Sequence, residues 1–133
     1  MPRLPAVLLA LATILLLPAA ARADQRSVGI KSSGKTIKLD DGDTVRIKLT
    51  ETPGTGFGWR VTKKPAAAVL KLKSNAFKVA PQEPGVPSVG GPGTRIFTYR
   101  AKGDGTSSVT IKLFPPGRGT KAAKKFTLKI VVD

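Results

Sequence analysis

The sequence predicts an all-β fold, an immunoglobulin-like antiparallel β-sandwich of about seven strands. Apolar and polar residues alternate in several short segments, which is typical of strands with one buried face. The 14 glycines and 11 prolines are spread along the 133 residues, so residues that interrupt helices are never far apart. Strands with one apolar and one polar face favour antiparallel sheets that pack against each other.

Six segments show this alternation clearly. Strands are expected at residues 37–39, 44–49, 70–73, 96–101, 109–113 and 126–132. Within them, Phe97, Tyr99, Ile111 and Leu128 are expected to point into the core. The chain has no cysteine, so the sandwich lacks the disulfide of antibody domains and depends on its apolar core.

The connections between these segments carry turn residues. Asp40–Asp43, with the sequence Asp-Asp-Gly-Asp, favours a tight reversal, and Asp104–Gly105 predicts a β-hairpin. Residues 64–69 are compatible with one helical turn. A metal or acid pair among the aspartates of residues 40–43 is an alternative, although this composition is ordinary for a turn.

The N-terminus has the features of an export signal. Arg3 is followed by an apolar run over residues 6–17 and by Ala21-Arg22-Ala23, which fits a small-x-small cleavage site. Twelve apolar residues are too few to cross a bilayer core, which needs about 20. We therefore expect a signal peptide at 1–23 and one domain at 24–133, which acts in the periplasm or outside the cell without a membrane span.

Composition excludes much of enzyme chemistry. The chain has no histidine and no cysteine, so it has no Ser-His-Asp triad, thiolate nucleophile or zinc finger. We expect neither catalysis nor a metal or other cofactor. We also expect a monomer.

The charge is strongly basic. Against 8 acids stand 23 lysines and arginines, giving +15, or +13 once a leader with two arginines is removed. The lysines are scattered, which favours a solvated surface that resists aggregation. Attraction to an acidic protein partner or an anionic envelope polymer is the alternative. Few aromatic residues lie among the lysines, so no platform for stacking bases is present and nucleic acid is not expected.

Three segments rich in glycine and proline do not fit strands. They cover residues 52–59, 84–93 and 114–119. Each alone is compatible with an ordinary long turn, but in a sandwich of this strand order all three should gather at one end, as binding loops do. Trp59, the only tryptophan, is expected to plug the core beneath the first segment rather than to contact a ligand.

The first of these segments resembles the chagasin family of cysteine-peptidase inhibitors, whose signature there is N-P-T-T-G-[YF]-x-W. The matching positions are Pro53, Thr55, Gly56, Phe57 and Trp59, while Thr52 and Gly54 replace the family's Asn and first Thr. The second segment and the strand after it are similar to the family's G-x-x-G-G and T-x-x-F-x-[FY]-x-A elements, carried here by Gly90, Gly91, Thr94, Phe97, Tyr99 and Ala101. At the family's R-P-[WFY] turn this chain has Phe114, Pro115 and Pro116, of which only Pro115 matches.

The resemblance implies a reversible, non-covalent inhibitor that fills the active-site cleft of papain-like cysteine peptidases with three loops. The peptidase-binding residues would be Thr52, Pro53, Gly54, Thr55, Gly56, Phe57, Gly90, Gly91, Phe114, Pro115 and Pro116. The alternative is a basic immunoglobulin-like module of the cell envelope, which binds anionic polymers or acidic protein partners without inhibiting a peptidase.

Overall fold

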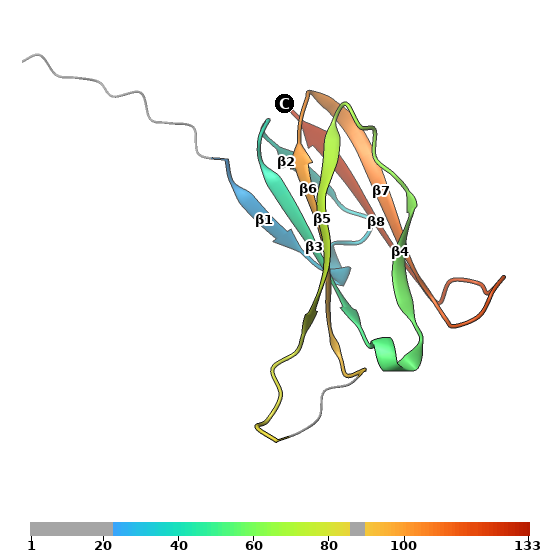
Figure 1. The fold of residues 1–133 in the computed structure, drawn as a ribbon. Helices are drawn as coiled ribbons and strands as arrows, with labels where there is room; N and C mark the ends of the chain where they lie inside the picture. The colour runs from blue at the N-terminus through green and yellow to red at the C-terminus, as the bar shows by residue number, and fades with distance from the viewer. Residues whose placement is uncertain (1–22, 86–89) are drawn as a thin grey trace, which may run out of the picture.

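Eight strands form two facing sheets in the computed structural model, which describes residues 23–85 and 90–133 (Figure 1). Of the expected signal peptide only Ala23 is described, and residues 86–89 of the second glycine-rich segment also lie outside the described residues. No helix in the part of the chain that the structure describes is long and apolar enough to cross a membrane.

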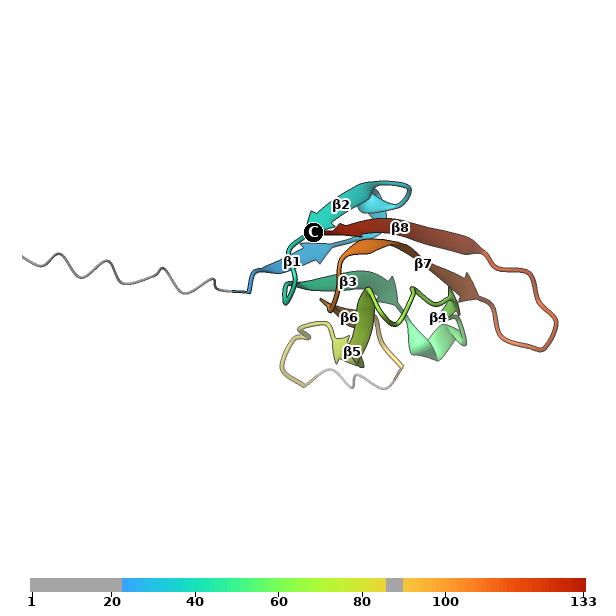
Figure 2. The ribbon, with the colours of Figure 1, turned by 90° about the horizontal axis from the view of Figure 1, so that it is seen from above.

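Each sheet has four strands. Sheet A has the order β1 (Gln25–Val28), β3 (Thr44–Glu51), β6 (Gly93–Ala101), β5 (Leu70–Val79), and sheet B has the order β2 (Thr36–Leu39), β8 (Lys124–Val132), β7 (Gly105–Phe114), β4 (Gly58–Lys63). Two short 3₁₀ helices, η1 (Ile30–Ser32) and η2 (Pro53–Thr55), lie in connections. Figure 2 shows β2 and β8 in a layer apart from β1 and β3.

The all-β sandwich is confirmed, with two differences in detail. The strands number eight, because β1 and the glycine-led β4 were not recognised from the sequence. The central pairs are antiparallel, but β1 pairs with β3, and β2 with β8, in parallel. Parallel pairing arises because the chain passes from the edge of sheet A to the edge of sheet B before it enters β3.

The hairpin predicted at Asp104–Gly105 is wrong. Strand β6 lies between β3 and β5, so it has no free edge for the next strand, and β7 joins sheet B instead. The turn at Asp40–Asp43 is present and likewise carries the chain between sheets. Residues 64–69 end in a turn in which the Val69 and Leu70 amides both donate to the Ala66 carbonyl at 3.0 Å, without forming a helix.

The core lies between the sheets and consists of their inward-facing apolar side chains. Phe97, Tyr99, Ile111 and Leu128 belong to it and are each at most 3% exposed. The buried cluster comprises Leu39, Val45, Ile47, Leu49, Trp59, Val69, Leu70, Phe97, Tyr99, Ala101, Val109, Ile111, Phe126, Leu128, Ile130 and Val132.

Strand β5 departs from the alternation that predicted it. Leu70 is 2% exposed, but Leu72, two residues on, is 44% exposed. Strand β5 is an edge strand of sheet A, and its register against β6 shifts between Leu72 and Ser74. The bulge takes the second leucine out of the core, so period-two alternation overstates burial there.

We predict unequal costs for removing these two leucines. Leu70→Ala should lower the free energy of unfolding by about 2–5 kcal/mol, since it leaves a cavity in the core. Leu72→Ala should change it by less than about 1 kcal/mol because the side chain is already half in water. Urea unfolding of both variants measures the difference, and equal losses would contradict the assigned register.

A second prediction concerns Tyr99. Burial raises the pKa of its phenol above the ordinary value, so the folded state holds the proton more tightly than the unfolded chain. This contribution to stability is present below about pH 10 and is lost as the pH rises further. Wild type should lose up to about 1.4 kcal/mol per pH unit relative to Tyr99→Phe above pH 10. The two proteins differ only in this hydroxyl, so parallel pH-dependent curves would refute the prediction.

Candidate functional site

Three connections lie at the end of the sandwich away from the C-terminus (Figure 1). Loop 1 is residues 52–57 between β3 and β4, loop 2 is residues 80–92 between β5 and β6, and loop 3 is residues 115–123 between β7 and β8. These are the three glycine- and proline-rich segments of the sequence, with their boundaries adjusted. Gly58, Trp59, Gly93 and Phe114, which were assigned to the loops, belong to strands.

Loop 1 is held rigid by its own backbone. Pro53 takes the first position of η2, where its fixed torsion suits a helix start. The Thr55 hydroxyl donates to the Thr52 carbonyl at 2.6 Å, and the Gly56 amide donates to the Pro53 carbonyl at 2.9 Å. Gly56 has φ of 79°, a left-handed conformation that favours glycine. Loop 1 therefore forms a single tight turn and leaves the Thr55 side chain exposed.

Loop 1 touches loop 2 through backbone alone. The Gly54 amide donates to the Gly90 carbonyl at 2.9 Å. A Cβ on Gly54 would lie 2.5 Å from that carbonyl oxygen, and one on Gly90 would lie 2.8 Å from the Gly54 Cα. Gly90 also has φ of 70°. The contact therefore requires glycine on both sides, which gives these two glycines a packing role that the sequence alone did not suggest.

Loop 1 also touches loop 3. A Cβ on Gly56 would lie 2.8 Å from the Cβ of Pro116, so the proline ring packs directly against the glycine. Loop 1 thus contacts loop 2 on one side and loop 3 on the other. The three loops form one connected surface with η2 at its centre.

The remaining predicted residues lie at the base of this surface. Gly91 follows Gly90 and is half-buried. Phe114 ends β7, and its ring centroid lies 4.2 Å from the guanidinium carbon of Arg60 on the neighbouring strand β4. Pro115 is half-buried, and its carbonyl accepts a hydrogen bond from the Thr120 hydroxyl across loop 3. Phe114 is therefore half-buried at the end of β7, next to loop 3, where a cation–π contact with Arg60 holds its ring.

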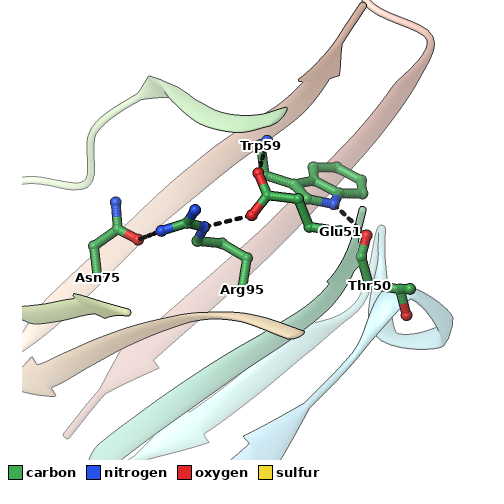
Figure 3. Close-up of polar contacts among 5 residues, drawn as sticks. All are labelled: Thr50, Glu51, Trp59, Asn75 and Arg95. Atoms are coloured by element: carbon green, nitrogen blue, oxygen red, sulfur yellow. Dashed lines mark hydrogen bonds and ion pairs between the residues drawn. The ribbon is translucent and has the colours of Figure 1, made fainter. Parts of the chain in front are cut away.

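A polar network beneath loop 1 ties the loops to the sheets (Figure 3). Trp59 is 6% exposed, and its indole N–H donates to the Thr50 carbonyl at 2.8 Å. Its backbone amide donates to Glu51 Oε1 at 3.1 Å. The other carboxylate oxygen of Glu51 lies 2.6 Å from Arg95 Nε, and Arg95 also donates to Asn75 Oδ1 at 3.2 Å.

This network was missed in the sequence, although a signal for it exists. Glu51 continues the inward register of Leu49, and Arg95 continues that of Phe97, so each places a charge where the pattern calls for an apolar residue. Two opposite charges in buried register on strands that pair with each other indicate an ion pair. Glu51 joins the strand before loop 1 to the strand after loop 2, and through Trp59 to the strand after loop 1.

The loop surface offers shape and backbone groups for recognition and no apparatus for catalysis. Its described side chains include Thr55, Phe57 and Pro116 beside bare glycine backbone. Loops 2 and 3 add the exposed charged residues Glu83, Arg118 and Lys121. Within residues 23–85 and 90–133, no three His, Cys, Asp or Glu side chains are grouped to hold a metal ion. A rigid surface of this kind is suited to contact with another molecule by shape.

Comparison with protein families identifies the class of binding protein. Residues 38–132 match the family described as Chagasin family peptidase inhibitor I42. The match spans most of the chain, and the chain belongs to this family of peptidase inhibitors. It is accordingly an inhibitor and not an enzyme. Comparison with curated proteins finds no match.

Solved structures share the fold at low sequence identity. The crystal structure of the cysteine protease inhibitor EhICP2 from Entamoeba histolytica has a TM-score of 0.72 at 20% identity, covering 84% of this chain and 97% of that one. The solution structure of Amebosin has a TM-score of 0.63 at 21% identity, with 84% and 100% covered. PbICP-C, solved in complex with falcipain-2, has a TM-score of 0.55 at 16% identity, with 84% and 92% covered.

The polar network yields a stability prediction. Glu51→Ala should lower the free energy of unfolding by about 2–4 kcal/mol, because Arg95 and the Trp59 amide lose their partner in a buried place. Glu83→Ala is the matched control: it removes the same charge from an exposed position in loop 2 and should change stability by no more than about 0.5 kcal/mol. Chemical denaturation measures both, and a Glu51→Ala cost as small as that of the control would contradict the role of the network.

Proposed function

We propose that this chain is a reversible, non-covalent inhibitor of papain-like cysteine peptidases, which it blocks by inserting its three loops into the active-site cleft. The observation that carries the proposal is the direct contact of loop 1 with both other loops, through Gly54–Gly90 and Gly56–Pro116. Membership of a peptidase-inhibitor family supports it, as does a structurally similar chain solved in complex with falcipain-2.

The geometry suits a wedge that fills a cleft by shape. Loop 1 lies at the centre and presents Thr55 and a half-buried Phe57, so it would approach the catalytic cysteine. Loops 2 and 3 lie on either side and would contact the cleft walls. Because the Gly54–Gly90 and Gly56–Pro116 contacts already hold loop 1 against its neighbours, loop 1 would lose little conformational entropy on binding. Preorganised inhibitors gain affinity in this way. The chain has no cysteine that could form a disulfide with the catalytic cysteine, and we expect the complex to form without a covalent bond.

We further propose that the inhibitor is exported and acts as a monomer in the periplasm or outside the cell. The support is the N-terminal segment, with Arg3, a twelve-residue apolar run and the small-x-small sequence ending at Ala23. A core that needs no disulfide is compatible with any redox environment.

The direct test is titration of papain with the domain that begins at Asp24. We expect dose-dependent loss of peptidase activity with a dissociation constant between nanomolar and micromolar, and recovery of activity on dilution because no bond forms. Full activity at a large excess of the domain would refute the proposal. Loss without recovery on dilution would refute its reversible character.

Two glycine-to-alanine variants distinguish an effect on the contact between loops 1 and 2 from an effect on folding. Gly54→Ala puts a methyl group against the Gly90 carbonyl, whereas Gly29→Ala puts one at an ordinary 3.5 Å from the Lys48 carbonyl. We expect Gly54→Ala to weaken papain inhibition about tenfold or more, since loops 1 and 2 must move apart, and Gly29→Ala to leave it unchanged. Circular dichroism checks that both variants fold. Equal inhibition by the two variants would show that the loop 1–loop 2 contact does not matter.

A further inference from the structure

The acidic residues are segregated from the two sheet faces. Of the 8 acids in the chain, Glu51 is buried and Glu83 lies in loop 2. The other six lie at the ends of strands or in the turns opposite the loops: Asp24, Asp40, Asp41, Asp43, Asp104 and Asp133. The outward-facing positions of both sheets therefore carry lysine and arginine but no carboxylate.

This imbalance is concentrated at one hollow on sheet A. Four exposed cations, Lys71, Lys73, Arg100 and Lys102, line a depression of about 280 Å³ together with a single acid, Asp41. Lys71 lies directly opposite Arg100 on the paired strands β5 and β6, an arrangement that is destabilising between like charges. None of the four has a carboxylate within 4.0 Å among the described residues, where the ion pair of Arg95 with Glu51 is the one present.

We propose that this hollow binds a sulfate or phosphate group of a linear anionic polysaccharide. An anion there would relieve the repulsion between Lys71 and Arg100. Arg46 and Lys48 continue the positive charge along the outward side of β3, so a polymer with repeated anionic groups could follow the face of sheet A. On β6, Phe97 and Tyr99 are buried, and on β5 the half-buried Phe77 lies against the Arg95 guanidinium. The described residues of this face therefore offer nucleic-acid bases no exposed ring on which to stack.

The position of the hollow has a functional consequence. It lies near the Asp40–Asp43 turn, at the opposite end of the sandwich from the loops (Figure 1). An inhibitor molecule bound to the polysaccharide through this hollow would keep its three loops free to contact a peptidase. Resting on the proposed function, the site would concentrate the inhibitor on an anionic matrix while it still blocks a peptidase.

The test is binding to heparin, used as a sulfated probe, measured across a range of salt concentrations. The variant Lys71→Gln/Arg100→Gln should bind heparin about tenfold or more weakly, and its salt dependence should fall by about two counterions, one for each cation removed. The matched control is Lys112→Gln/Lys125→Gln, a directly opposed pair on the outer face of sheet B that loses the same charge. The control should retain most of the wild-type affinity.

Three results would overturn the proposal: equal loss of binding in both double variants, no binding of heparin by wild type, or tighter binding of a single-stranded oligonucleotide than of heparin. Heparin binding is measured without a peptidase, so its outcome is independent of the proposed inhibition. Papain inhibition that persists at saturating heparin supports the separation of the two sites, and inhibition abolished by heparin contradicts that separation.

A second inference comes from a different contact, at the start of the domain. The Asp24 backbone nitrogen donates to Asp43 Oδ1 at 2.8 Å, and the Asp24 carbonyl accepts from the Thr44 amide at 2.9 Å. Asp43 is 7% exposed, and its other oxygen accepts from the Asp40 amide at 2.9 Å. Asp24 is therefore fixed on a buried carboxylate next to the expected cleavage site.

From this geometry we infer that cleavage after Ala23 turns an amide-to-carboxylate hydrogen bond into an ammonium–carboxylate ion pair and stabilises the mature domain. Water hydrolyses the Ala23–Asp24 peptide bond, Ala23 leaves with the new carboxylate, and the Asp24 nitrogen becomes an ammonium group 2.8 Å from Asp43 Oδ1. The amide bond to a carboxylate is already charge-assisted, and an ammonium donor adds the Coulomb attraction of a full positive charge at short range. Export would in this way be coupled to completion of the fold.

The test compares a chain that begins at Asp24 with the same chain extended by Gly-Ser. At pH 6, where the terminal amine is protonated, the free amine should lower the equilibrium constant for unfolding about tenfold. Asp43→Asn should remove the difference, and so should pH 10 in the unmutated chains, since the amine is then neutral. Equal stability of the two chains at pH 6 would overturn the inference, as would a difference that persists at pH 10.

Discussion

The close approach of Gly54 to Gly90 is the contact on which the binding end of the molecule depends. Two loops from different strand pairs meet there with no side chain between them, and one amide-to-carbonyl hydrogen bond fixes their separation. The third loop is set in the same way, by a proline ring against Gly56. The shape of the loop surface therefore depends on glycines that let the loops approach each other closely. The positions of the exposed side chains follow from that shape.

This surface would be loose if it were not anchored to the sandwich. Glu51 provides the anchor, because its carboxylate binds Arg95 on β6 and the Trp59 amide on β4 while its backbone belongs to β3. These strands lead into or out of loops 1 and 2. A buried pair of this kind contributes little net stability compared with an apolar pair, but it fixes which strands lie together, and here those strands carry the loops.

The sequence predicts the sandwich because alternation reports which face of a strand is buried, and six of the eight strands alternate. Strand β4 was missed because Gly58 and Trp59 continue a glycine-rich segment, and β1 because its four residues are mostly exposed. The false hairpin at Asp104–Gly105 shows a limit of local patterns, since a turn does not reveal whether a sheet edge is free. The contacts of Gly54 and Gly56 could not be predicted either, because glycine has no side chain whose chemistry would indicate what it packs against.

The charged residues are also unevenly distributed over the molecule. Opposite-charge pairs on the sheet faces would have lowered the repulsion between lysines, yet six of the acids lie at the end remote from the loops. The buried apolar cluster between the sheets stabilises the sandwich, so the sandwich can tolerate repulsion on its outer faces without losing its packing. A fold stabilised from within leaves both its loop surface and its sheet faces available for recognition, so the two sites proposed above, one for a peptidase and one for an anionic polymer, can lie at different ends of one small domain.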